Sequence, residues 1–164
     1  MQSDEKIQAH LVSVWRESRK RFFSIGGREG MLVLTDKHLM FIHKTKAKVT
    51  WWKAVTQRQV VSFIRSKNTM IRHDGYGEEE LRTDLSDKKN VELSFDDISK
   101  ISFGEKTWGS VLEMEYEKNG KKEKHRYSIA QDWVKYPAKE PTKYMKVDWS
   151  PFVQYIKDRQ GSTK

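Results

Sequence analysis

One stretch decides the fold: residues 30–42 read GMLVLTDKHLMFI. Two apolar runs, residues 31–34 and 39–42, flank the polar residues 35–38. Short apolar runs joined by a tight polar connection are typical of a β-hairpin. We therefore predict that these residues form two strands and the turn between them.

More strands are expected further along the chain. Residues 91–95 alternate apolar and polar side chains with a period of two, which indicates a half-buried strand, and the alternation resumes at residues 101–103 after a turn-like segment. Residues 110–116 and 125–129 predict a second hairpin, because Asn119-Gly120 between them is a pair favoured in two-residue type I′ turns.

Three segments have helical patterns. A C-terminal helix is expected near residues 149–160, with Pro151 in its first turn and Gly161 as its stop. Residues 50–67 predict a helix with a broad apolar face, although residues 60–64 alone also fit a strand. Residues 78–85 predict a short acidic helix. Residues 4–17 fit either a helix or a strand.

Composition sets limits on the class of protein. The 164 residues include 32 Lys plus Arg and 23 Asp plus Glu, a formal charge of +9, and 12% are aromatic. Such aromatic content favours a folded chain, and the length predicts one domain. The absence of Cys excludes disulfides, Cys-ligated metals and cysteine nucleophiles. With neither a membrane-spanning stretch nor a secretory signal, we expect a cytoplasmic protein, peripheral at the inner membrane surface.

The stretch at 30–42 resembles the signature hairpin of GRAM and bacterial pleckstrin-homology-like domains, which carry Gly-x-Leu-x-Leu-Thr-Asx-basic-x-Leu-x-Phe there. The later strands, the Asn119-Gly120 hairpin and the C-terminal helix come in that family's order. The resemblance implies an α+β, mainly β fold, in which about seven strands form a bent antiparallel sheet or barrel capped by the C-terminal helix. Residues 44–90 exceed the family's usual connection, so we expect an inserted helical segment there within a single domain, 1–164.

The same resemblance implies a binding module without catalytic chemistry, for anionic lipids or protein segments. The residues agree with this expectation. The five histidines lack metal-ligand spacing, and the glycine-rich residues 26–30 match neither nucleotide-binding fingerprint. Asp96-Asp97 is interpreted as a turn rather than an acid–base pair. We expect no catalytic residue, cofactor or metal.

Charge is distributed unevenly along the chain. Residues 15–28 and 118–126 each hold five basic residues and one acid, whereas residues 78–97 hold eight acids and three bases. This pattern predicts a positive face and an acidic patch. Single-stranded nucleic acid is a minor alternative partner, disfavoured because the acidic stretch would repel a phosphate backbone.

These patterns predict two groups of site residues. Basic residues in or beside the two turns are expected to hold an anionic headgroup, the last three only if both turns lie at the same end: Arg19, Lys20, Arg21, Arg28, Lys121, Lys122 and Lys124. Each cation contributes about 1 kcal/mol at an anionic membrane. Aromatic residues beside basic ones are candidates for membrane insertion or partner contact, or else for burial: Phe22, Phe23, Trp51 and Trp52. The alternative function is a protein-interaction module that uses the inserted helices.

Overall fold

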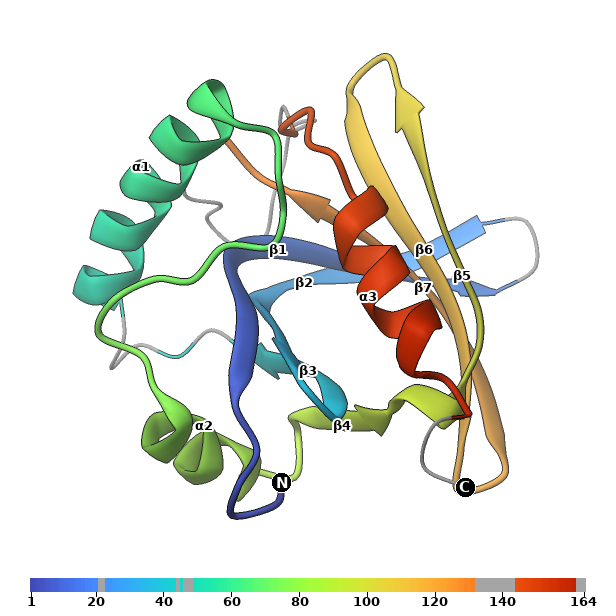
Figure 1. Cartoon of the computed structure of the whole chain (residues 1–164). Helices are drawn as coiled ribbons and strands as arrows, with labels where there is room; N and C mark the ends of the chain where they lie inside the picture. Colours follow the sequence, from blue (N-terminus) through green and yellow to red (C-terminus); the bar gives the residue numbers. More distant parts are fainter. Residues whose placement is uncertain (21–22, 44, 46–48, 132–143, 162–164) are drawn as a thin grey trace.

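The computed structural model describes residues 1–20, 23–43, 45, 49–131 and 144–161. Seven strands form one antiparallel sheet in the order β4-β3-β2-β1-β7-β6-β5 (Figure 1). The strands are β1 (Ile7–Lys20), β2 (Phe23–Thr35), β3 (His38–His43), β4 (Val91–Ser94), β5 (Ile98–Lys106), β6 (Gly109–Lys118) and β7 (Lys121–Ile129). The outermost strands β4 and β5 are separated in the chain only by a 3₁₀ turn, Phe95–Asp97, so the sheet bends to bring its two edges together. The predicted mainly β fold with a bent sheet is confirmed.

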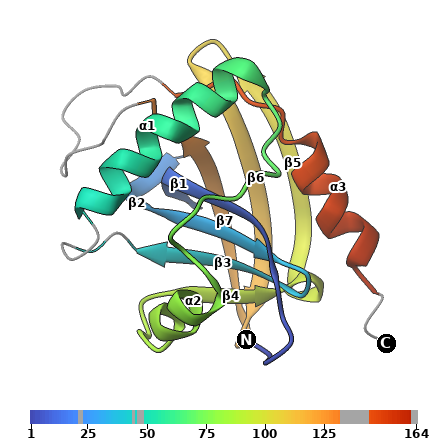
Figure 2. The same cartoon turned by 60° about the vertical axis from the view of Figure 1, so that its left-hand side comes forward.

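Three helices complete the fold: α1 (Val49–Arg65), α2 (Glu78–Leu85) and α3 (Ser150–Arg159). The C-terminal helix α3 packs against β5 and the 3₁₀ turn, as predicted. The other two helices lie within residues 44–90 and cover the opposite face of the first three strands (Figure 2). The helices expected at 50–67 and 78–85 are thus confirmed.

The decisive hairpin is buried on both of its faces. Alternate side chains point into the inner core, which α3 completes: Leu32, Leu34, Leu39 and Phe41. The side chains between them point to a second core under α1 and α2: Met31, Val33, Met40 and Ile42. Burial on both faces explains why these strands are continuous apolar runs rather than alternating ones.

The turn of this hairpin is fixed by its own polar side chains. Thr35 Oγ1 accepts hydrogen bonds from the backbone N–H groups of Lys37 (3.1 Å) and His38 (2.8 Å). Asp36 Oδ1 accepts one from the N–H of Lys6 (3.0 Å), just before β1. The Thr-Asp pair therefore closes the turn and fastens the start of the first strand to it.

The ambiguous segment 4–17 belongs mostly to strand β1. Its pattern is mixed because β1 contains a bulge at Ser13, whose φ is +54°, and the register with β2 shifts between Leu11 and Val14. The extra residue inserts an odd step into the period-two alternation. Apolar side chains on either side of the bulge then fall at spacings that also fit a helix.

Helix α1 supplies the polar partners of this bulge. Trp52 Nε1 donates to Ser13 Oγ (3.0 Å), which is also hydrogen-bonded to Thr56 Oγ1 (2.7 Å). Gln59 Oε1 accepts from the N–H of Val12 (2.9 Å), and Gln59 Nε2 donates to its C=O (2.7 Å). The side-chain amide of Gln59 thus makes the two hydrogen bonds to Val12 that the backbone of a neighbouring strand would otherwise make. These bonds anchor the inserted helix to the sheet.

The second hairpin also has its predicted geometry. Asn119 and Gly120 have φ values of +54° and +75°, as a type I′ turn requires. The two strands pair from Leu112 with Tyr127 to Lys118 with Lys121.

Candidate functional site

Two arginines lie side by side at the margin of the inner core. Arg16 on β1 pairs directly with Arg28 on β2 and, on its other side, with Tyr127 on β7. Directly opposed residues of an antiparallel pair project from the same face of a sheet. The Arg16 guanidinium lies 4.4 Å from the centre of the Phe41 ring and is half-buried, whereas Arg28 is exposed. The two arginines thus extend from the edge of the core to the solvent.

Neither arginine has an acidic partner among the described residues. The nearest acids in the chain point the other way. Glu17 pairs with Gly27 and Glu29 pairs with Trp15, so both carboxylates project from the opposite face of the β1–β2 ribbon. The ribbon therefore separates its charges, with two guanidinium groups on one face and two carboxylates on the other.

The two guanidinium groups affect the histidines around them. Burial lowers the pKa of His43, and the charges of Arg16 and Arg28 lower it further. Burial also lowers the pKa of His125 to about 4, again with a contribution from Arg16. His125 therefore stays neutral at pH 7, where its Nε2 lies 3.0 Å from the hydroxyl oxygen of Tyr116. The positive charge at this margin comes from the arginines.

The structure places only some of the site residues that were predicted around the turn between β1 and β2. Arg21 and Phe22 lie outside the described residues, as do the side chains of Arg19, Lys20 and Phe23. Arg28 can be placed, and it is paired with a residue that the sequence did not single out as a site. Arg16 was missed because only the strand register, not the composition of the segment, sets it opposite Arg28.

The basic residues of the β6–β7 hairpin have a different environment from the one predicted. Lys122 pairs with Glu117, Lys124 with Glu115 and Arg126 with Glu113. The ammonium of Lys124 lies 3.5 Å from the Glu115 carboxylate, and the Arg126 guanidinium lies 3.1 Å from that of Glu113. Lys121 instead pairs with Lys118.

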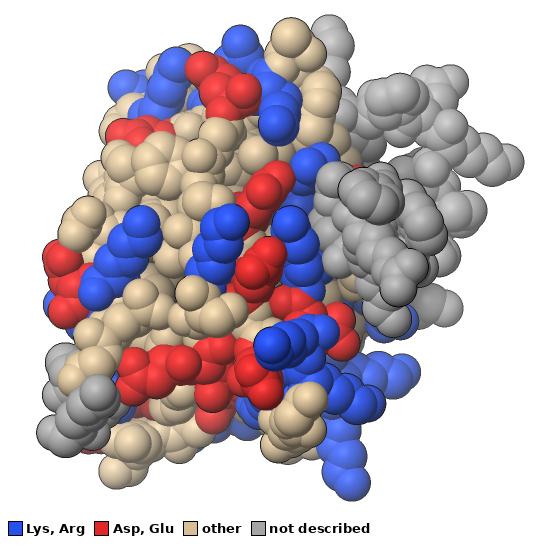
Figure 3. Space-filling view, turned by 90° about the vertical axis from the view of Figure 1, so that its right-hand side faces the viewer, with Lys and Arg blue, Asp and Glu red and all other residues tan. Residues whose placement is uncertain are grey.

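Figure 3 shows this mixture of signs, with acidic and basic side chains interleaved on one face. Figure 1 shows the β6–β7 turn at the lower end of the molecule, whereas the paired ends of β1 and β2 lie at mid-height. We therefore remove Lys121, Lys122 and Lys124 from the candidate site. A charge count over residues 118–126 leaves out the acidic residues that pair with them from β6.

The two tryptophans follow the burial alternative. Trp52 is fully buried and bonded to Ser13, so it is not available for membrane insertion or partner contact. Trp51 is half-buried and stacks with His10 and Tyr76, each at 5.8 Å between ring centres. Both side chains serve the second core, because α1 turns its aromatic residues toward the sheet.

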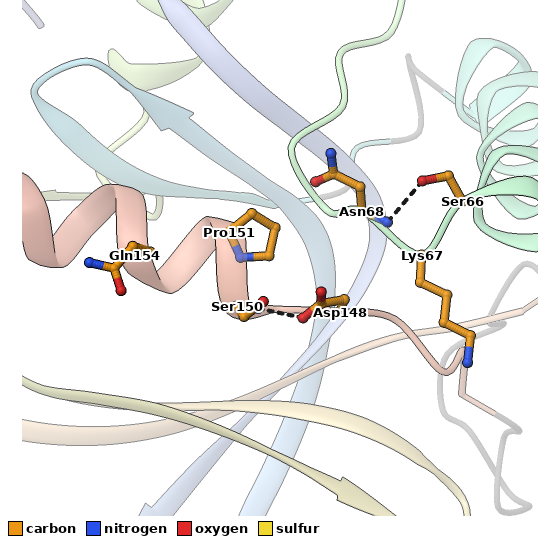
Figure 4. A pocket seen from close by; sticks show the side chains of 7 residues that line it. All are labelled: Ser66, Lys67, Asn68, Asp148, Ser150, Pro151 and Gln154. Atoms are coloured by element: carbon orange, nitrogen blue, oxygen red, sulfur yellow. Dashed lines mark hydrogen bonds between the residues drawn. The ribbon is translucent and has the colours of Figure 1, made fainter.

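One open cleft of about 610 Å³ lies between the end of α1 and the start of α3 (Figure 4). It is lined by Ser66, Lys67, Asn68, Asp148, Ser150, Pro151 and Gln154. The Asp148 carboxylate accepts from the N–H of Ser150 (2.9 Å), and the backbone N–H of Asp148 donates to the C=O of Lys67 (2.8 Å). The second of these bonds joins the two segments.

Within the ranges that the structure describes, no group of three or more His, Cys, Asp or Glu residues has an arrangement that could hold a metal ion. In the same ranges, no helix is both long and apolar enough to span a membrane.

Comparisons with known proteins add little to this picture. No family model and no curated protein matches the chain. Among solved structures, it is similar to the hSac2 domain from the human phosphoinositide phosphatase Sac2, with a TM-score of 0.40 and 11% sequence identity. That similarity covers 96% of this chain and 69% of the other. The GRAM resemblance therefore stays a prediction from the sequence.

Proposed function

We propose that this protein is a non-enzymatic binding module of the pleckstrin-homology-like kind that binds anionic phospholipid headgroups at a membrane surface. The observation that carries the proposal is the Arg16–Arg28 pair. Like charges directly opposite one another in a sheet are destabilising. A bound anion between the two guanidinium groups would remove that repulsion.

The chemistry of the pair favours a phosphate. A guanidinium presents a planar fork of N–H donors that matches the oxygens of a phosphate, and it keeps its charge at any physiological pH. Arg16 is held in place by its contact with Phe41, whereas Arg28 is free to reach outward. Arg19, Lys20 and Arg21 follow Arg16 closely in the sequence and would add to the attraction.

Vesicle co-sedimentation of the full chain tests the proposal. We expect binding to vesicles that contain phosphatidylserine or a phosphoinositide, less binding at higher salt, and none to pure phosphatidylcholine. Arg28→Gln should weaken binding by about 1 kcal/mol, or roughly fivefold. The matched control is Lys124→Gln, which removes the same charge from a lysine already paired with Glu115.

Two results would count against the proposal. Equal binding to neutral and anionic vesicles, or no binding to either, would refute the function. Equal effects of Arg28→Gln and Lys124→Gln would refute the site. Calorimetric titration with soluble inositol trisphosphate then distinguishes a headgroup pocket, which binds the free ligand, from a site that needs the bilayer.

A further inference from the structure

The net charge of the protein comes from one continuous segment. Residues 37–73 contain nine basic residues and no acid, so the rest of the chain holds 23 of each and is balanced. The segment runs from the turn of the decisive hairpin through β3 and α1. What distinguishes the segment in the sequence is the absence of acidic residues over its whole length.

The orientation of α1 decides where these charges point. Trp52, Thr56 and Gln59 are bonded to the β1 bulge, and Val55 and Phe63 are buried beside them. This anchored side fixes the rotation of the helix about its axis. The opposite side is exposed along the length of the helix and consists of Lys53, Ala54, Gln57, Arg58, Val61, Ile64 and Arg65.

This outward face combines unpaired cations with exposed aliphatic groups. Lys53, Arg58 and Arg65 make no ion pair with any described residue. They span the helix from its first turns to its last, about 18 Å at 1.5 Å per residue. Between them, Val61 is 49% exposed and Ile64 is 75% exposed, although most aliphatic side chains of the protein are buried.

We propose that the outward face of α1 lies flat on an anionic bilayer, with Lys53, Arg58 and Arg65 among the headgroups and Val61 and Ile64 below them. This inference rests on the proposed function and names a second contact for it. A helix with a basic rim and an exposed apolar centre is suited to the membrane interface. Cations spread evenly along a helix match the diffuse charge of a bilayer better than a discrete acidic site.

A protein partner is less well supported by the composition of the face. Interface hot spots are enriched in aromatic residues packed into pockets, and no aromatic residue is exposed on this side of α1.

Two measurements on the full chain test the inference. The first is vesicle binding by the double variant Arg58→Gln/Arg65→Gln, for which we expect a loss of about 25-fold at low salt. Its control is Lys100→Gln/Lys124→Gln, an equal charge change on β5 and β7. The second uses the absence of native cysteine: Ile64→Cys and Phe103→Cys are labelled with an environment-sensitive fluorophore. Phe103 is 49% exposed on β5.

We expect the label at position 64, but not the one at 103, to shift to the blue when phosphatidylserine vesicles are added. If the unmodified protein binds these vesicles while position 64 stays in water and the double variant matches its control, the inference is wrong and the proposed function stands. If the unmodified protein binds no anionic vesicle, both are wrong. A blue shift that requires an acidic protein and does not occur with vesicles would assign the face to a protein partner and overturn the inference.

Discussion

Gln59 is the residue whose replacement tests the architecture most directly. Its side chain is fully buried and makes both hydrogen bonds to the backbone of Val12, at 2.9 Å and 2.7 Å. Gln59 Oε1 also lies 2.9 Å from His73 Nε2. In Gln59→Met the side chain keeps nearly the same length and volume but loses every one of these bonds.

The magnitude follows from the two backbone groups left behind. A buried donor or acceptor without a partner costs about 1–3 kcal/mol. The N–H and C=O of Val12 lie at the bulge, where Val12 has no register partner on β2 and both groups are bonded to Gln59, so we expect Gln59→Met to lower the free energy of unfolding by about 2–5 kcal/mol. That is a large share of the roughly 5–15 kcal/mol typical of a domain.

Urea unfolding, followed by tryptophan fluorescence and far-UV circular dichroism, measures this loss. Gln57→Met is the matched control, because Gln57 lies on the exposed side of the same helix. Its effect should stay within about 0.5 kcal/mol. Hydrogen exchange should show faster exchange at the Val12 amide in Gln59→Met alone. If both variants are equally stable and the Val12 amide remains protected, the bulge does not depend on α1.

Three further predictions concern stability. Burial lowers the pKa of both His73 and His125 to about 4, whereas a histidine in an unfolded chain has a pKa near 6.5. The unfolded state therefore binds more protons, and the free energy of unfolding falls as the pH drops from about 6.5 toward 4. Urea unfolding at pH 7 and pH 5 should differ by about 2–4 kcal/mol, and a flat profile would contradict this. Gly120→Ala should cost about 1–2 kcal/mol because φ is +75°, whereas Gly104→Ala, equally open but without a positive φ, should cost less in the same assay. Gly30→Ala should cost about 1–3 kcal/mol or prevent folding, since a Cβ there would lie 2.5 Å from a backbone oxygen of β3; a melting temperature equal to that of the unmodified protein would refute the contact.

The parts of the fold that the sequence predicted depend on local signals. The two hairpins were readable because Thr35-Asp36 and Asn119-Gly120 determine turns with their own side chains and φ angles. The part it left open, residues 4–17, depends on a contact 39 residues away, between Trp52 and Ser13. A bulge whose polar atoms are satisfied by a distant helix leaves no signature in the residues around it.

The candidate site follows the same division. Arg28 was predicted, but its neighbour Arg16 appears only with the register of β1 and β2. Lys122 and Lys124 looked like free charge until β6 placed Glu117 and Glu115 opposite them. The local charge depends on which residues the strands bring together. A count of charges along the chain therefore missed the Arg16–Arg28 pair and overestimated the positive charge at Lys122 and Lys124.

The burial of the decisive hairpin on both of its faces also determines how the proposed function must be tested. Removing residues 44–90 would delete α1 and α2 and expose Met31, Val33, Met40 and Ile42 together. A contiguous exposed apolar surface of this kind promotes aggregation. Loss of vesicle binding in such a deletion would therefore say nothing about the outward face of α1. Substitutions at Arg58, Val61, Ile64 and Arg65 leave the buried anchors of the helix intact, so only they separate the role of α1 in the fold from its proposed contact with a membrane.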